Sequence, residues 1–106
     1  MRFVFAIVVG CLALHSSAQA GDAVAGRKTA VKCQVCHGLD GVSKNPDAPN
    51  LSGQVERYLL KSLQSYKSGE RKNDQMAVIT KGLQDADMEN LAAYFASVKI
   101  TVEKPK

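Results

Sequence analysis

The chain has 106 residues, of which 45% are hydrophobic and 23% charged, and its formal net charge is +4 at pH 7. This length allows one domain, and the apolar fraction is too high for a disordered chain. The charge is modest and the basic residues are dispersed, which argues against a nucleic-acid-binding protein.

The first part of the chain is organised like a secretory signal peptide. An uncharged apolar run at 3–14 follows Arg2, and the small-x-small sequence Ala18-Gln19-Ala20 provides a cleavage site. We therefore predict a signal peptide at 1–20, cleaved after Ala20, and a mature domain at 21–106. We expect export to place this domain in the periplasm, without a membrane span in its mature form.

Two alternatives for this segment have weaker support. A membrane anchor needs about 20 apolar residues, whereas this run is interrupted at His15. A lipid-attachment site at Cys11 would follow Arg2 too closely, and a better cleavage site lies downstream.

The predicted mature chain opens with a helix over residues 22–32. This segment is rich in Ala, lacks Pro, and begins at Asp22, whose carboxylate can accept from the first free backbone N–H groups. Residues 38–53 have the Gly, Pro, Asn, Asp and Ser content of a loop. A loop this long in a small domain usually has a function or something to wrap.

Apolar spacing predicts two further helices. Residues 54–68 form one, closed by Gly69, and the last begins near Gln84-Asp85 with acidic residues in its first turn. A polar stretch at 69–75 and a short apolar piece at 76–79 lie between them. The expected buried stripes are Val55, Tyr58, Leu59, Ser62, Leu63 and Tyr66 in the first helix, and Met88, Leu91, Ala92, Phe95 and Val98 in the last. No strand pattern competes, so the predicted fold class is all-α.

The sequence Cys33-Gln34-Val35-Cys36-His37 is a C-x-x-C-H motif, the attachment pattern of c-type haem. Two thiols three positions apart on one helical turn can each add to one vinyl group of the porphyrin. His37 is then held under the iron, which it can bind through Nε2. We therefore predict one haem c per chain, attached through Cys33 and Cys36, with His37 as the proximal axial ligand.

Three other interpretations of the motif are less favoured. A Cys33–Cys36 disulfide would close a very short loop and constrain little. A thioredoxin-like redox pair belongs in a βαβ context, which this helical chain lacks. A zinc site needs four ligands, and the motif provides three.

The second axial ligand can be narrowed by elimination. No His follows His37, so the candidates are Met76, Met88, a Lys amine, or no protein ligand. Met88 lies on the apolar stripe of the last helix, where Met most often fills the core. Met76 follows a polar, flexible loop that can pass around the haem edge and return on its other face. We therefore favour Met76, whose thioether raises the reduction potential relative to a second imidazole.

Together these residues resemble the small soluble class I cytochromes c, most closely the bacterial mono-haem type that is similar to one half of a di-haem cytochrome c. The resemblance spans the predicted mature chain. It is carried by an ordered series of motifs: Gly26, the C-x-x-C-H-G with Gly41, Pro49-Asn50-Leu51-x-Gly53-Gln54, Tyr58, Gly69-x-Arg71, Met76, Leu83-x-Asp85-x-Asp87 and Ala92-Ala93-Tyr94-Phe95-Ala96. One departure is Gln84, where the family often has a Ser or Thr cap.

The resemblance implies a cytochrome c fold, with three main helices plus short helical turns wrapped around one covalently bound haem. The first and last helices would cross at Gly26 and the Tyr94 region. The Pro49 carbonyl, rather than that of Pro46, would accept from His37 Nδ1–H. Arg71 would face a haem propionate, or simply be solvated. Tyr66 would pack on the macrocycle or sit in the helix core.

A haem with two protein ligands predicts a one-electron carrier rather than an enzyme. The alternatives are a cytochrome c subunit of a larger dehydrogenase complex and, less favoured, a haem peroxidase or gas-binding protein. The expected partners are redox proteins with acidic docking surfaces, met by a monomer or weak dimer of this chain. Five lysines would form a basic rim around the haem edge and attract such partners: Lys28, Lys32, Lys44, Lys72 and Lys81. A solvated surface of mixed charge explains these lysines equally well.

Overall fold

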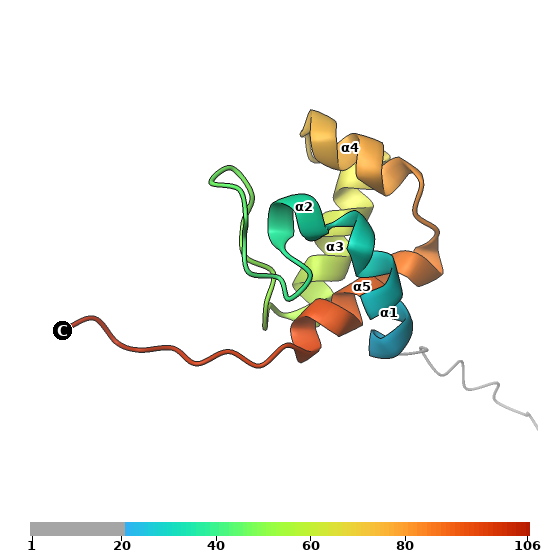
Figure 1. The fold of residues 1–106 in the computed structure, drawn as a ribbon. Coiled ribbons are helices and arrows are strands. Elements are labelled where there is room, and N and C mark those ends of the chain that lie inside the picture. Colours follow the sequence, from blue (N-terminus) through green and yellow to red (C-terminus); the bar gives the residue numbers. More distant parts are fainter. Residues whose placement is uncertain (1–20) are drawn as a thin grey trace, which may run out of the picture.

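The computed structural model describes residues 21–106, and every regular element in that range is helical (Figure 1). The elements are α1 (Ala23–Thr29), the 3-10 helix η1 (Ala30–Lys32), α2 (Gln34–His37), α3 (Glu56–Ser68), α4 (Asp74–Lys81) and α5 (Asp85–Ser97). The predicted all-α fold class is therefore confirmed. Within the same range, no helix is long and apolar enough to cross a membrane. The predicted signal peptide lies outside the described residues and stays a prediction.

The first and last helices form the most extensive contact between two elements. Gly26 of α1 is buried at the crossing, where a Cβ would lie 1.9 Å from the backbone oxygen of Asn90 and 2.8 Å from Cβ of Tyr94. Only a residue without a side chain allows the two helices to approach this closely. The structure thus contains the crossing that the family resemblance implies.

The single helix predicted over 22–32 is divided in the structure into α1 and the 3-10 helix η1. Asp22 caps α1 as expected, because its Oδ1 accepts from the backbone N–H of Val24 at 2.8 Å. Beyond Thr29 the chain becomes a 3-10 turn, in which Cys33 N–H donates to the carbonyl of Ala30 at 2.9 Å. This shorter-range bond redirects the backbone while Ala30 remains fully buried.

The segment between α3 and α5 differs from the expected loop. Gly69 has the left-handed φ of +81° and ends α3 as predicted. The chain then forms a two-turn helix, α4, with Asn73 as its N-cap. Met76 therefore lies inside the first turn of a helix rather than simply following a flexible loop. Two turns are too short for apolar periodicity to reveal them in the sequence.

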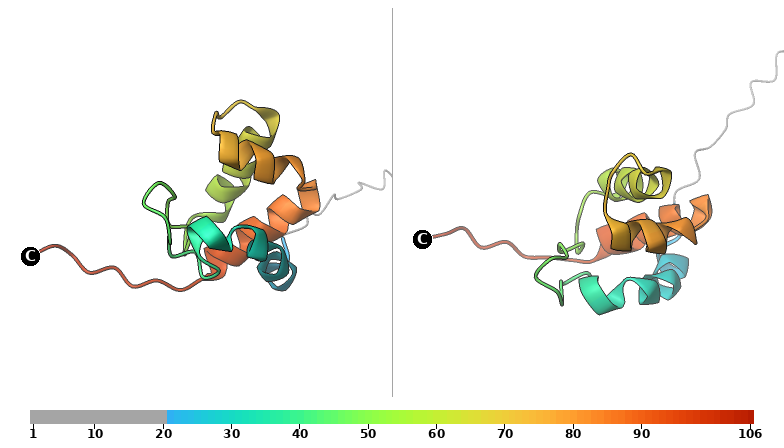
Figure 2. Two further views of the ribbon diagram at one scale, coloured as in Figure 1. Left: turned by 45° about the horizontal axis from the view of Figure 1, so that its top comes forward. Right: turned by 90° about the horizontal axis from the view of Figure 1, so that it is seen from above.

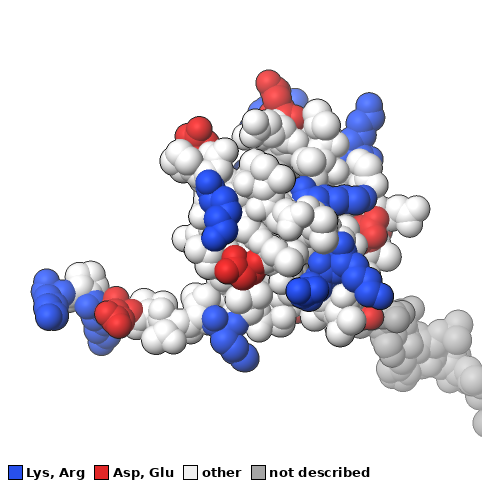
Figure 3. All heavy atoms as spheres, viewed as in Figure 1, with Lys and Arg blue, Asp and Glu red and all other residues white. Residues whose placement is uncertain are grey.

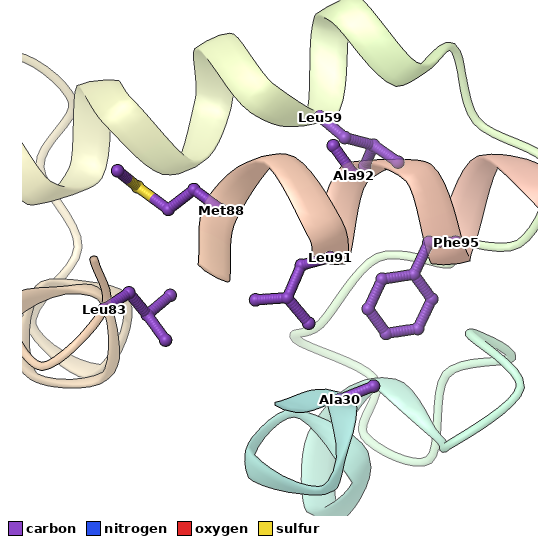
Figure 4. Packing of buried hydrophobic residues seen from close by; sticks show 7 residues of the cluster. All are labelled: Ala30, Leu59, Leu83, Met88, Leu91, Ala92 and Phe95. Atoms are coloured by element: carbon purple, nitrogen blue, oxygen red, sulfur yellow. The ribbon is translucent and has the colours of Figure 1, made fainter. Parts of the chain in front are cut away.

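Helix α5 packs against both α1 and α3, and Figure 2 shows it between these two helices. Four of the five residues expected on its inner face are buried, whereas Val98 is half-buried at the C-cap. The core cluster consists of Ala30, Leu59, Leu83, Met88, Leu91, Ala92 and Phe95 (Figure 4). Gln84 is the N-cap of α5, where the Asp87 carboxylate accepts from the Gln84 N–H at 2.9 Å.

Candidate functional site

A cavity of about 760 Å³ opens among the helices. Residues from α2, α3, α4 and α5 line it, together with the segment 47–51, and most of these side chains are apolar. A volume of this size is typical of sites for small molecules and cofactors. Five residues of the stripe predicted for 54–68 face this cavity rather than a closed core: Tyr58, Leu59, Ser62, Leu63 and Tyr66. The prediction was wrong for Val55, which is the N-cap of α3, is 64% exposed and does not line the cavity.

The C-x-x-C-H motif forms part of this wall. Cys33, Cys36 and His37 all line the cavity, and the two cysteines are not joined in a disulfide. Burial raises the pKa of Cys33 to about 11, although the nearby Lys32 ammonium acts in the opposite direction.

The ring of His37 is held in one orientation. His37 is 8% exposed, and its Nδ1 lies 2.8 Å from the carbonyl oxygen of Pro49. A carbonyl can only accept, so Nδ1 must carry the proton in this contact. The lone pair of the neutral ring is then on Nε2, the atom that binds a metal. This is the hydrogen bond that the resemblance implies, and its acceptor is the carbonyl of Pro49 rather than that of Pro46.

The long loop after His37 is ordered by its own polar side chains. The Ser43 hydroxyl donates to the carbonyl of Ala48 at 2.7 Å, and Asn50 Oδ1 accepts from the backbone N–H of Ser43 at 2.7 Å. These bonds cross the loop on either side of Pro49. The polar side chains that predicted a loop here therefore also hold the Pro49 carbonyl in place for His37.

The two candidate methionines occupy different environments. Met76 is half-buried on α4 and lines the cavity. Met88 is 2% exposed and belongs to the core cluster, and it is not among the residues that line the cavity. Figure 4 shows the Met88 side chain among the core residues of α5. Figures 1 and 2 draw α2 and α4 as separate helices, so Met76 and His37 reach the cavity from two different elements.

Tyr66 and Arg71 also line the cavity and contact each other. The Arg71 guanidinium lies 4.7 Å from the centroid of the Tyr66 ring, within the range of a cation–π interaction. Arg71 N–H donates to the carbonyl of Ser65 at 3.0 Å, which fixes its backbone beside the end of α3. Tyr66 is half-buried and Arg71 is exposed.

The residues present fit a covalently attached haem. Two thiols and an imidazole share one stretch of wall, a thioether comes from another helix, and an apolar surface separates them. Imidazole and thioether are ligands that bind haem iron in c-type cytochromes. The hydrogen bond from His37 to Pro49 orients the imidazole for this purpose.

Several residues of the cavity wall were not predicted as part of the site. Leu91 and Phe95 were expected in the core of the last helix, and they are both buried and part of the cavity wall. Apolar periodicity identifies an inward face, but it does not distinguish protein packing from contact with a cofactor. Leu51 also lines the cavity, and its place in the motif Pro49-Asn50-Leu51 could have identified it from the sequence.

Comparison with known proteins places this geometry in a family. Residues 19–99 match the sequence profile of cytochrome c. The chain is 48% identical to cytochrome c4 of Pseudomonas aeruginosa over 83 residues, which covers 78% of this chain and 41% of that protein. It is 43% identical to cytochrome c-554(548) of Halomonas halodenitrificans, covering 74% of this chain and 98% of that protein.

A solved structure agrees with the sequence matches. The crystal structure of reduced recombinant cytochrome c4 from Pseudomonas stutzeri superposes with a TM-score of 0.72 and 46% identity, covering 78% of this chain and 48% of that one. The chain thus spans less than half the length of these two cytochromes c4. The resemblance seen in the sequence is confirmed: the chain belongs to the cytochrome c family, with one covalently bound haem c as its cofactor.

Proposed function

We propose that this protein is a one-electron carrier whose haem is attached through Cys33 and Cys36 and ligated by His37 and Met76. The observation that carries the proposal is that all four side chains line one cavity. When bound, the haem iron supplies the redox chemistry by alternating between the ferrous and ferric states. The protein supplies the ligands, the apolar surroundings and a fixed geometry.

The ligand assignment rests on placement. The hydrogen bond between His37 Nδ1–H and the Pro49 carbonyl presents Nε2 to the iron and increases the basicity of the ring. Met76 is favoured over Met88 because it lines the cavity, whereas Met88 is buried in the core cluster. Arg71 would face a haem propionate from its place against Tyr66, and Tyr66 would pack on the macrocycle.

Two protein ligands favour a carrier over an enzyme. With His37 and Met76 both bound, oxygen or peroxide has no free coordination position. A fixed ligand set also changes little between the two oxidation states, so electron exchange needs little rearrangement. The near-complete match to cytochrome c-554(548) supports a domain that can constitute a whole protein.

The proposed site of action is the periplasm, reached through a signal peptide cleaved after Ala20. The proposed partners are redox proteins with acidic docking surfaces. Five exposed lysines support this proposal: Lys28, Lys32, Lys44, Lys72 and Lys81. Lys32 also lines the cavity. On the face in Figure 3, blue and red side chains are interspersed, so any steering would come from local groups of lysines rather than from net charge.

The test of ligation uses a matched pair of variants. We expect absorption spectra of the purified holoprotein to contain the weak Met-to-ferric-iron charge-transfer band, and a denaturing gel to retain covalent haem. Met76→Leu should abolish the band because it removes the sulfur and keeps an apolar side chain. Met88→Leu should retain the band, since this conservative core substitution costs less than about 1.5 kcal/mol.

Several results would contradict the proposal. Absence of covalent haem would reject the site as a whole. Survival of the band in Met76→Leu, or its loss in Met88→Leu, would reject the ligand assignment. Rapid binding of carbon monoxide by the ferrous wild-type protein would favour a gas-binding protein or peroxidase.

The alternative of a dehydrogenase subunit uses the same domain and the same ligands. Sedimentation of the purified protein at micromolar concentration separates the two functions. A free carrier should sediment as a monomer or weak dimer, whereas a subunit should purify with its dehydrogenase.

A further inference from the structure

Met76 lies where a helix is weakest. It is the third residue of α4, after Asp74 and Gln75. The N–H groups of a first helical turn have no acceptor within the helix, so this turn frays unless other groups satisfy them. A ligand placed there would be carried away from the cavity whenever the turn opened.

Two side chains hold the backbone of Met76 on both sides of its Cα. Asn73 Oδ1 accepts from the Met76 N–H at 2.9 Å, and the Thr80 hydroxyl donates to the Met76 carbonyl at 2.7 Å. The first bond satisfies a donor that would otherwise be unpaired within the helix. The second supplements the ordinary helical bond to the same carbonyl.

Thr80 connects the backbone of Met76 to the protein interior. It is fully buried, and it is not among the residues that line the cavity, so it can act on the site only through its neighbours. Its carbonyl accepts from Leu83 N–H at 3.0 Å, and the carbonyl of Leu83 in turn accepts from the Lys67 ammonium of α3. The first turn of α4 is thereby linked to α3.

We propose that Asn73 and Thr80 are positioning residues that keep Met76 in place as the distal ligand. This inference rests on the proposed function, because it assumes that Met76 binds the iron. Neither Asn73 nor Thr80 is itself a ligand of the iron. Each reduces the population of frayed states in which the Met76 thioether has left the cavity.

The experiment measures how readily an added ligand replaces Met76. Imidazole is titrated into the ferric holoprotein while the Met-to-iron band is followed. Asn73→Ala should raise the apparent affinity for imidazole about fivefold, the equivalent of a helix cap worth about 1 kcal/mol. The affinity rises because a larger fraction of the protein is competent to bind. Thr80→Val should act in the same direction.

Matched controls separate positioning from general stability. Asp22→Ala removes the cap of α1, where Asp22 Oδ1 accepts from Val24 N–H at 2.8 Å. Thr29→Val removes a hydroxyl that donates to the carbonyl four residues earlier at 3.5 Å, the same kind of contact as in Thr80. Both controls should leave imidazole affinity unchanged. Asn73→Ser and Thr80→Ser retain a capping oxygen or a hydroxyl and should restore wild-type affinity.

The outcomes distinguish this inference from the proposed function. Wild-type imidazole affinity in both Asn73→Ala and Thr80→Val would overturn the positioning role, even if Met76→Leu abolishes the band. An equal rise in the α1 controls would also overturn it, because general loosening would then explain the effect. A band that persists in Met76→Leu, seen before any imidazole is added, would overturn the ligand assignment and the inference together.

Discussion

Replacement of Gly26 by Ala tests the helix crossing on which the site is built. The added Cβ would lie 1.9 Å from the oxygen and 2.5 Å from the carbon of the Asn90 carbonyl, and 2.8 Å from Cβ of Tyr94. The two closest atoms are backbone, so no side-chain rotation relieves the overlap. Ordinary contact begins near 3.4 Å, and α1 and α5 would therefore have to separate by roughly 1.5 Å.

The cost of this separation exceeds the benefit of Ala in a helix. Overpacking of a tight site costs about 1–3 kcal/mol, and a backbone clash lies at the upper end of that range. Ala gains about 1 kcal/mol over Gly in helix propensity. The net loss is about 2 kcal/mol, which lowers the midpoint of thermal unfolding by about 8–16 °C in a domain of this size.

Thermal unfolding of the holoprotein, followed by far-UV circular dichroism, measures this effect. Gly82→Ala is the control, because the nearest atom to its added Cβ is the Ile79 oxygen at 3.9 Å. The control should unfold at or slightly above the wild-type temperature. If Gly26→Ala unfolds no earlier than the wild type, the packing argument for this crossing is wrong.

Three further substitutions test single contacts, and the first two should lower the free energy of unfolding measured in urea. Tyr94→Phe loses the hydroxyl that donates to the Leu39 carbonyl at 2.6 Å, which should cost about 1 kcal/mol; an unchanged midpoint would mean that water replaces the bond. Leu91→Ala leaves a cavity at a side chain that is 1% exposed and should cost about 3 kcal/mol. Ser43→Ala removes a hydroxyl that lies 2.6 and 2.7 Å from two loop carbonyls and can donate to one of them at a time, so amide hydrogens near Pro49 should exchange faster while those of α5 are unaffected.

Features that depend on local chemistry were predictable from the sequence. The Asp22 carboxylate can cap the start of a helix, and Gly69 can adopt the left-handed conformation that ends one. In the structure, Asp22 is the N-cap of α1 and Gly69 is the C-cap of α3. The apolar spacing of Met88, Leu91 and Phe95 identified the inner face of α5. In each case the deciding interaction lies within a few residues along the chain.

Features that depend on distant contacts were harder to predict. The break after Thr29 depends on how Ala30 is buried, and nothing in the Ala-rich segment itself marks it. Helix α4 combines an Asn cap with a short apolar run, which does not by itself distinguish a helix from a loop. The sequence already favoured Met76 over Met88 as the second ligand, because Met88 lies on the apolar stripe of the last helix, and the cavity wall supports Met76.

The pairing of α1 with α5 has a consequence for the order in which the chain assembles. Helix α5 supplies Leu91, Ala92 and Phe95 to the cavity wall, and it follows the C-x-x-C-H motif by almost 50 residues along the chain. A contact between segments this far apart in sequence must offset the entropy lost when the long stretch of chain between them is closed. The cavity that Cys33 and Cys36 line is therefore complete only when α5 has docked against α1.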